Sequence, residues 1–464
     1  MRTMASKALA DVKMEPFWLD RPDRPETLPP LATARKADLL VVGGGFTGLW
    51  AAIQARQARP DGTVILIEKS SVASGASGRP GGVVSTSVMH GLSNAARIFP
   101  KDIAALELLG QENMRGFMQT IAENGIDCHA EWGGELNVAI EDSQIDALQE
   151  EHALHLKYGH NAVFLDGEAL AGHIRSPRYK AGVWTKDIAG TVHPALLAWG
   201  LKRLALKLGV EIYETTPLKT MEEAAGRMRV TTPYGSVIAD RVLLATNAFM
   251  AGHRHIKRRI VPVRDRVLAT QPLTDAQMEA IGWGNRQGIY DMRTQMNYMR
   301  LTQDNRIIFG GRLAYAFNGE TSPAVDREHD TYAPLAGAFF DTFPQLEGLS
   351  FSHAWSGAID LSTRMAVHFQ RYYGGKVVYA GGYSGFGVSA SRFGARVALD
   401  ILAGSTLPES KLEFATKLPS VVPPEPFRWL GAQITMNALD TADAKGGWRL
   451  PWLKFVSTLG FPWQ

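Results

Sequence analysis

The stretch from residue 38 to residue 68 constrains the fold of this chain more than any other part of the sequence. It contains a short apolar run (38–42), a glycine turn, an alanine-rich segment that ends near Arg59, and a second apolar run (64–67) followed by Glu68. Short apolar runs predict buried strands, and the segment between them is long enough for a helix. This order is typical of a Rossmann-type unit, which binds dinucleotides.

The glycines of the turn have the G-x-G-x-x-G spacing. Gly43 permits a tight turn, Gly45 lets the backbone approach a pyrophosphate, and Gly48 lets helix and strand pack closely. The N–H groups at the helix start suit phosphates, and Glu68 is placed to accept hydrogen bonds from a ribose. We therefore predict dinucleotide binding. The alternative is a strand-turn-helix unit with chance glycines and no phosphate ligand.

Two further segments point to the same ligand. The loop after Glu68 (69–82) consists largely of small residues, so its backbone can wrap a large flat molecule. Much later, an apolar run (377–381) enters a second glycine loop and a helix, and that helix N-terminus would favour negative charge. Two strand–glycine–helix units far apart in sequence suggest one shared cofactor.

Composition excludes several other classes of protein. The 464 residues suffice for two or three domains, and 49 Lys and Arg against 46 Asp and Glu give no reason to expect nucleic-acid binding. The single cysteine, Cys128, excludes an intrachain disulfide and fits a reducing, cytoplasmic location. We expect no secretory signal, no membrane-spanning helix and no metal site, because His155 and His160 form only a loosely spaced pair.

The fingerprint, Glu68 and the loop 75–82 resemble the D-amino-acid-oxidase superfamily of FAD-dependent amine oxidoreductases. The likeness is greatest to the γ-glutamylputrescine oxidoreductase-like and glycine/sarcosine-oxidase-like branch and covers about residues 15–410. It implies an α/β fold, with an FAD-binding Rossmann-like domain of the GR2 type and an α+β substrate domain built on a large mixed or antiparallel sheet. Pro80 stands where the branch commonly has Asn, and residues 363–366 replace a D-x-x-P turn.

The resemblance and the glycine segments together define the expected FAD contacts. By resemblance, Leu218 meets the adenine, the turn at 246–247 passes near the pyrophosphate, and the second glycine loop closes over the flavin. The expected contacts are Gly43, Gly45, Phe46, Thr47, Gly48, Glu68, Lys69, Gly75, Ala76, Ser77, Arg79, Gly81, Gly82, Leu218, Thr246, Asn247, Gly382, Ser384, Gly385, Phe386 and Gly387.

The resemblance also implies a discontinuous domain organisation. We expect an N-terminal arm (1–33), an FAD-binding domain (34–104, 186–262 and 350–410), a substrate domain (105–185 and 263–349) and a C-terminal extension (411–464). The arm is either pinned by Phe17 and Trp18 or disordered. The extension, rich in Pro, Trp and Gly, either covers the FAD-binding domain or forms a subunit contact, and membrane contact is not expected.

Local patterns predict several elements of the substrate domain. Residues 105–125 and 143–158 have helical spacing, and residues 128–140 read as a strand pair around Gly133 and Gly134. Residues 261–271 alternate apolar and charged side chains, as in a strand of a half-exposed sheet.

By resemblance, the chemistry is FAD-dependent oxidation of the C–N bond of an amine or N-substituted amino acid. Hydride passes to flavin N5, and the imine hydrolyses to an aldehyde or keto product. An arginine would bind a carboxylate or phosphonate end of the substrate. The substrate-side candidates are Arg79, His193, Arg293, Tyr298, Arg300, Arg312 and Arg364, and no general base is identified.

Other outcomes stay open at this point. The flavin is expected to be noncovalent, because Cys128 lies outside the segments that tether flavin in relatives and Pro80 occupies the loop position. The lysine that activates oxygen in sarcosine-oxidase-like relatives aligns near Ile308, so the electron acceptor is open, as are the substrate side chain and the oligomeric state. Alternatives are oxidation of a hydroxy acid or polyol phosphate, and a non-catalytic flavin-binding subunit.

Overall fold

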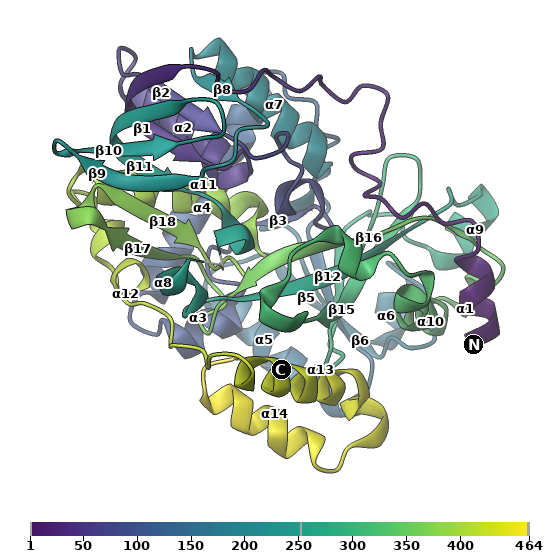
Figure 1. The fold of residues 1–464 in the computed structure, drawn as a ribbon. Coiled ribbons are helices and arrows are strands. Elements are labelled where there is room, and N and C mark those ends of the chain that lie inside the picture. Colours follow the sequence, from purple (N-terminus) through teal and green to yellow (C-terminus); the bar gives the residue numbers. More distant parts are fainter. Residues whose placement is uncertain (1, 251–252, 462–464) are drawn as a thin grey trace.

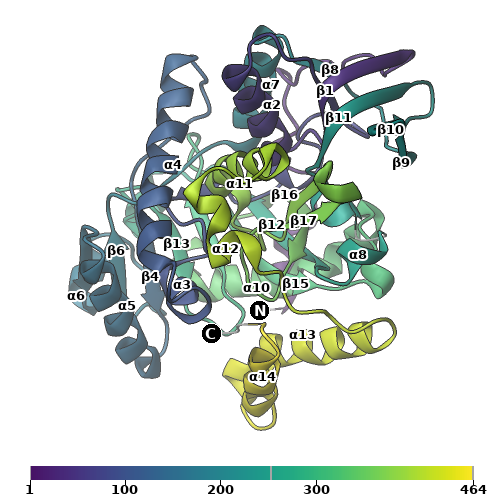
Figure 2. The same cartoon turned by 90° about the vertical axis from the view of Figure 1, so that its left-hand side faces the viewer.

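Two eight-stranded sheets form the body of the protein. The computed structural model describes residues 2–250 and 253–461, and Figures 1 and 2 show the sheets side by side with helices around them. A small third sheet pairs β3 (Val83–Ser85) with β7 (Ala189–Thr191). Among the described residues, no helix combines the length and apolar character needed to cross a bilayer.

The first sheet has a parallel centre in the order β18-β11-β1-β2-β8. Strand β17 pairs antiparallel at one edge, and the hairpin β9–β10 pairs with the first half of β11. Its strands are β1 (Ala34–Val42), β2 (Val64–Ile67), β8 (Glu211–Tyr213), β9 (Thr220–Ala224), β10 (Arg227–Thr231), β11 (Ser236–Leu244), β17 (His368–Tyr372) and β18 (Val377–Gly381).

Both faces of this sheet are buried, which explains its continuous apolar strands. Leu39 and Val41 face a core shared with the surrounding helices, whereas Leu40 and Val42 belong to the core under the β9–β10 hairpin. The helices packed in the first core are α2 (Phe46–Ala58), α4 (Ile103–Glu123), α7 (Pro194–Lys207) and α11 (Gly387–Ala403), with α3 (Leu92–Ile98) beside α4.

The second sheet is mixed, with the order β16-β12-β15-β14-β13-β4-β6-β5, and only β13 and β4 run parallel. Its strands are β4 (Glu135–Ala139), β5 (Ala162–Leu165), β6 (Ala181–Thr185), β12 (Val261–Thr270), β13 (Gly288–Asp291), β14 (Tyr298–Leu301), β15 (Ile307–Ala314) and β16 (Phe351–Leu361). The expected combination of a Rossmann-like sheet and a large mixed sheet is confirmed.

One face of the second sheet packs against α1 (Arg2–Ala8) and α10 (Ala333–Thr342). Leu136 and Val138 of β4 point into this core, so the alternate residues Glu135 and Asn137 face the other way. The remaining helices are α5 (Ile145–Lys157), α6 (Gly167–Ala171), α8 (Arg254–Lys257), α9 (Asp275–Ile281), α12 (Glu413–Thr416), α13 (Phe427–Lys445) and α14 (Arg449–Thr458).

The N-terminal arm is pinned to the body. Trp18 is 1% exposed, and its indole N–H donates to Pro80 O at 2.8 Å. Lys13 exchanges main-chain hydrogen bonds with Ser352 and Ala354 of β16. The arm also contains α1, a helix that the sequence reading did not anticipate.

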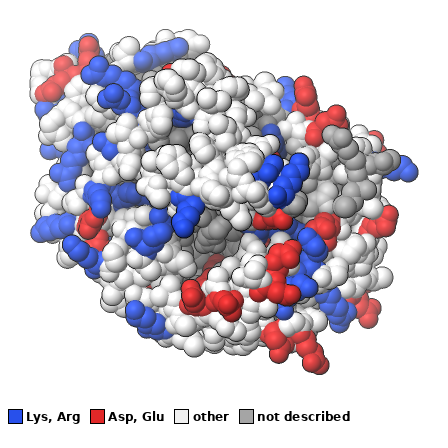
Figure 3. Space-filling model, turned by 90° about the horizontal axis from the view of Figure 1, so that it is seen from below, with Lys and Arg blue, Asp and Glu red and all other residues white. Residues whose placement is uncertain are grey.

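The C-terminal extension divides in two. Its first part packs in the core beside the first sheet, where Phe414 contacts Phe99 and Phe393. The hairpin of α13 and α14 instead lies below the second sheet in Figure 1, where Met436 packs against Val263 and Leu361 of that sheet. Seen from this side, the surface carries both basic and acidic side chains (Figure 3). Residues 462–464 lie outside the described residues.

Two expectations need correction. Residues 128–140 hold one strand, β4, because Gly134 (φ +78°) turns the chain and Glu131 makes only an isolated bridge to Thr191. Strand β12 is mostly buried instead of half exposed, because Val267 on one face and Leu268 on the other pack in different cores. Strand β16 pairs along its length with β12, and the chain next enters the first sheet with β17.

Candidate functional site

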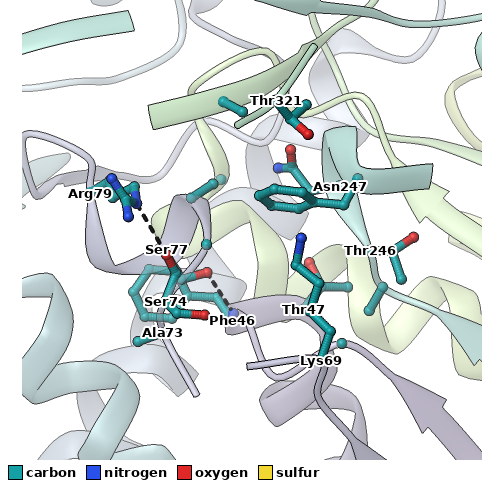
Figure 4. Close-up of a pocket in the computed structure, with 18 of the residues that line it drawn as sticks. Phe46, Thr47, Lys69, Ala73, Ser74, Ser77, Arg79, Thr246, Asn247 and Thr321 are labelled. Carbon is teal, nitrogen blue, oxygen red and sulfur yellow. Dashed lines mark hydrogen bonds between the residues drawn. The ribbon is translucent and has the colours of Figure 1, made fainter. Parts of the chain in front are cut away.

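The first cavity is a cleft of about 630 Å³ that follows the expected cofactor segments. It runs from the β1–α2 turn past the loop after β2 to the start of α11. Figure 4 shows Thr47, Lys69, Ser77 and Asn247, which come from different elements, arranged around one space.

The glycine turn leaves no room for side chains. Gly43 has φ +115°, and a Cβ there would lie 2.4 Å from Ala245 O. At Gly45, which lines the first cavity, a Cβ would lie 2.9 Å from the Ser77 hydroxyl. At Gly48 a Cβ would lie 1.9 Å from Gly43 O, so this glycine serves packing and does not line the cavity.

Glu68 lies at the end of β2, on the wall of the first cavity. Its carboxylate accepts hydrogen bonds from Gly44 N (2.7 Å) and Ser70 N (2.9 Å). Burial raises the pKa of Glu68 above its usual value, although these two N–H groups oppose the shift. The carboxylate therefore ties the glycine turn to the following loop while it faces the cavity.

The loop after β2 continues the wall with serine and arginine. Ser77 Oγ accepts from Phe46 N at the start of α2 (2.9 Å), and Arg79 donates from Nε to Ser74 O (3.1 Å) and from Nη1 to Ser356 O (2.9 Å). Figure 4 draws the bonds of Ser77 with Phe46 and of Arg79 with Ser74. Burial, with Arg264 nearby, lowers the pKa of Arg79 to about 10.

The first cavity fits FAD. Arg79, Arg264 and Lys69 bring positive charge to its wall, which suits an anionic cofactor. Thr246 Oγ1 is buried on this wall without a hydrogen-bond partner, so a bound ligand can satisfy it. The α2 N-terminus and the backbone-lined turn complete a cradle for the ADP half.

Fifteen of the expected cofactor residues line the first cavity. They are Gly43, Gly45, Phe46, Thr47, Glu68, Lys69, Gly75, Ala76, Ser77, Arg79, Leu218, Thr246, Asn247, Gly385 and Gly387. Four others, Gly81, Gly82, Ser384 and Phe386, line a neighbouring second cavity. Gly48 and Gly382 line neither; Gly382 has φ +87° and donates its N–H to Asp360.

The second cavity, of about 490 Å³, lies against the second sheet. The two cavities meet at a junction, the set of residues that line both: Ala76, Arg79, Pro80, Ile359, Gly385 and Val388. Leu439 of α13 and Ser457 of α14 also line the second cavity, so the C-terminal hairpin forms part of its wall. A flavin ring at the junction would have the second cavity open to it.

Tyr298 and Asp265 form a pair in the second cavity. The Tyr298 hydroxyl donates to Asp265 Oδ2 at 2.6 Å, and burial raises the pKa of Asp265 to about 6. Asp265 pairs in register with Gly357 of β16, where a Cβ would lie 3.2 Å from Arg79 Cβ. The carboxylate therefore lies beside the junction. The sequence analysis did not identify Asp265 and Arg264 as site residues. The pattern that could have identified them is three consecutive charged residues (264–266) inside an otherwise apolar strand.

The substrate-side candidates fall into two groups. Arg79, Arg293, Tyr298 and Arg312 line the second cavity. The other three line neither cavity and bond instead to the main chain.

In that second group, Arg300 donates to Val192 O (2.6 Å) and Leu301 O (2.8 Å). Arg364 donates to the carbonyls of residues 414 and 417, and His193 caps α7 by accepting from Leu196 N (3.3 Å). These bonds give the three residues structural roles.

Two residues considered above for flavin attachment and for oxygen activation also lie away from both cavities. Cys128 is buried in the first core, and Ile308 is fully buried in the same core. Among the described residues, one group has metal-ligand geometry, Glu15, Asp20 and His353. Asp20 there already bonds Lys13 (2.6 Å) and His353 (3.0 Å).

Comparison with known proteins identifies the family of this chain. Residues 38–401 match the family model FAD dependent oxidoreductase (DAO). The chain is 30% identical over 414 residues to a probable oxidoreductase OrdL of Haemophilus influenzae, covering 87% of this chain and 91% of the relative. It is 29% identical over 373 residues to the gamma-glutamylputrescine oxidoreductase of Escherichia coli, covering 79% and 84% of the two chains.

A solved structure supports the fold. The glycine oxidase of Geobacillus kaustophilus superposes with a TM-score of 0.67 at 17% identity, over 81% of this chain and 96% of that one. With the resemblance in sequence and the cleft described above, this protein belongs to the FAD-dependent oxidoreductase family and is an enzyme with FAD as its cofactor.

Proposed function

We propose that this enzyme oxidises the C–N bond of an amine or an N-substituted amino acid to an imine, which hydrolyses to an aldehyde or keto product. The observation that carries the proposal is the junction, where a second cavity with a buried carboxylate opens beside the cofactor cleft. The relatives named gamma-glutamylputrescine oxidoreductase and glycine oxidase support an amine or amino-acid substrate.

FAD, when bound in the first cavity, supplies the acceptor for the hydride. The glycine turn and Glu68 would hold its ADP half, and Arg79 with the second glycine loop would lie at its flavin end. Because the first cavity offers neither a cysteine nor a histidine among its described lining residues, we propose that FAD is held noncovalently. Flavin that stays on acid-precipitated protein would contradict this.

The protein must also deal with the proton of the substrate amine. A free amine has a pKa near that of lysine, about 10.4, so it enters mostly as the ammonium form. Asp265, with a pKa near 6, is largely ionised at neutral pH and can accept this proton at a carboxylate oxygen, while Tyr298 holds it in place. The enclosed cavity further disfavours the ammonium form.

An anionic end of the substrate would be bound by Arg79. Arg293 already pairs with Asp291 and Asp341, and Arg312 pairs with Asp440 at 2.7 Å. Arg79 instead bonds main-chain carbonyls and lies at the junction. Its charge is therefore not neutralised by any described carboxylate, unlike the charges of the other two arginines.

Anaerobic mixing of the FAD-loaded protein with a panel of compounds tests the proposal. The panel contains amines, N-methyl amino acids, hydroxy acids and polyol phosphates. We expect loss of the oxidised-flavin absorbance with amines or N-methyl amino acids. Loss only with hydroxy acids or polyol phosphates, or with none of the panel, would reject the proposal.

A further inference from the structure

Glu135 is a carboxylate in the second cavity that makes no ion pair with any described residue. It points from β4 away from the apolar core and lines the second cavity. Its Oε2 atom is buried without a hydrogen-bond partner, and no ion pair to Glu135 is present among the described residues. Burial raises its pKa to about 7 and Glu151 adds to the shift, while the nearby His155 and His160 oppose it.

Two other acids on this wall are already partnered. Asp265 accepts from Tyr298, and Asp291 accepts from Asn297 and pairs with Arg293. Glu107 Oε2 also lacks a hydrogen-bond partner but lies 3.1 Å from His160 Nε2, whereas Glu135 has neither a hydrogen bond nor an ion pair among the described residues.

A chain of polar groups lies beside Glu135 and supports the same conclusion. Glu107 pairs with His160 at 3.1 Å, His160 Nδ1 lies 2.9 Å from His155 Nδ1, and His155 lies 3.6 Å from Glu151. Asn137, next to Glu135 on the cavity face of β4, donates to Glu151. Glu107 and Glu151 therefore have an imidazole or an amide beside them within this chain, whereas the cavity-facing Glu135 has no ion pair among the described residues and can take its partner from a ligand.

Glu135 is far from the reacting end of the cavity. Asp265 is on β12 and Tyr298 on β14, whereas Glu135 is on β4, two strands beyond β14 in the sheet. With strands spaced about 4.8 Å apart, β4 lies roughly 10 Å from β14. Between them the Tyr290 ring stacks on Phe386 of the second glycine loop (centroids 6.1 Å apart), which gives an apolar wall for a methylene chain.

We propose that Glu135 binds a positively charged group at the end of the substrate opposite the oxidised amine. The preferred substrates are then amines that carry a second ammonium or guanidinium group on an aliphatic chain. This inference rests on the proposed amine oxidation and adds the substrate class. A cation beside Glu135 would supply the partner that the protein does not provide.

The test uses the FAD-loaded full chain with α,ω-diamines of three to eight carbons and the monoamines of the same lengths. For the wild type we expect kcat/KM at least tenfold higher for the best diamine than for its matched monoamine, with an optimum of chain length. Glu135→Gln keeps the shape and should lose at least tenfold for the diamine, mostly in KM, with less than threefold change for the monoamine.

Two controls make the result interpretable. Glu150→Gln, at an exposed glutamate of α5, should change neither substrate, and Glu135→Asp should recover part of the diamine preference. Flavin absorbance shows that each variant binds FAD.

Three outcomes would overturn the inference. Equal rates with diamines and monoamines in the wild type would reject it, as would equal losses for both in Glu135→Gln; both results leave amine oxidation intact. If no amine reduces the flavin, the proposed function fails and the role of Glu135 falls with it.

Discussion

The two cavities differ in what lines them. The first cavity is shaped at the glycine turn by main-chain atoms, and a side chain at Gly43 would collide with a carbonyl oxygen. The second cavity is shaped by side chains from helices, sheet strands and the C-terminal hairpin. A backbone-lined site depends on local turns, whereas a side-chain-lined site depends on how distant elements meet. The first is therefore suited to a constant cofactor and the second to a particular substrate.

The largest effect should come from a side chain in the glycine turn. Gly43→Val forces a branched residue into φ +115° and places its Cβ 2.4 Å from Ala245 O. The unfavourable backbone alone costs about 1–2 kcal/mol, and we expect flavin content to fall at least tenfold. Gly226→Val, at φ +77° in an open turn, is the matched control. Full flavin content in Gly43→Val, read from the ratio of flavin to protein absorbance, would show that the backbone does not define this site.

A change in the second cavity should affect turnover and spare the cofactor. Asp265→Asn removes the proposed proton acceptor, and general-base roles contribute roughly 10²–10⁴-fold, so we expect kcat/KM to fall at least 100-fold. Flavin content should stay normal, as it should in the exposed control Asp61→Asn.

The pH dependence of kcat/KM tests the proposed role of Asp265 in a second way. Because the base must be ionised, kcat/KM of the wild type should fall as pH drops below about 6, where Asp265 takes up a proton. This limb should disappear in Asp265→Asn. A variant that keeps wild-type turnover and the limb would remove Asp265 from the reaction.

An intermediate effect is expected at Glu68, which lines the first cavity and which we propose to bind the ribose. Glu68→Gln keeps the shape but removes the charge that accepts from Gly44 N and Ser70 N. Hydrogen bonds to charged groups are worth about 1.5–3 kcal/mol, so the Kd for FAD should rise about tenfold. At saturating FAD, kcat should be unchanged; a loss of kcat would mean that the two cavities are coupled through this end.

The smallest effect should come from the contact between the C-terminal hairpin and the second sheet. Arg312 and Asp440 pair at 2.7 Å but are 25% and 40% exposed, so the pair is worth only about 0.2–1 kcal/mol. Arg312→Gln and Asp440→Asn should each change KM about two- to fivefold, without loss of FAD. Their double-mutant cycle measures the coupling, and a zero coupling energy would mean that the pair does not hold this wall.

Glycine spacing reports directly on backbone conformation, so the sequence could point to the turn around the first cavity. Gly43 has the positive φ of a tight turn, and Gly45 and the loop after β2 line one space. The arginines were harder to assign. Arg300 and Arg364 have the chemistry of anion binders, yet both are used to bond main-chain carbonyls.

What the sequence determined by itself is the cofactor unit, from the strand before Gly43 to Glu68, because a βαβ unit and its turn are local structures. The tertiary structure decided the substrate side. It brought Asp265 of β12 against Tyr298 of β14, set Glu135 two strands further along, and placed the C-terminal hairpin on the cavity wall. None of these contacts follows from local periodicity, because each depends on the order in which distant strands pair.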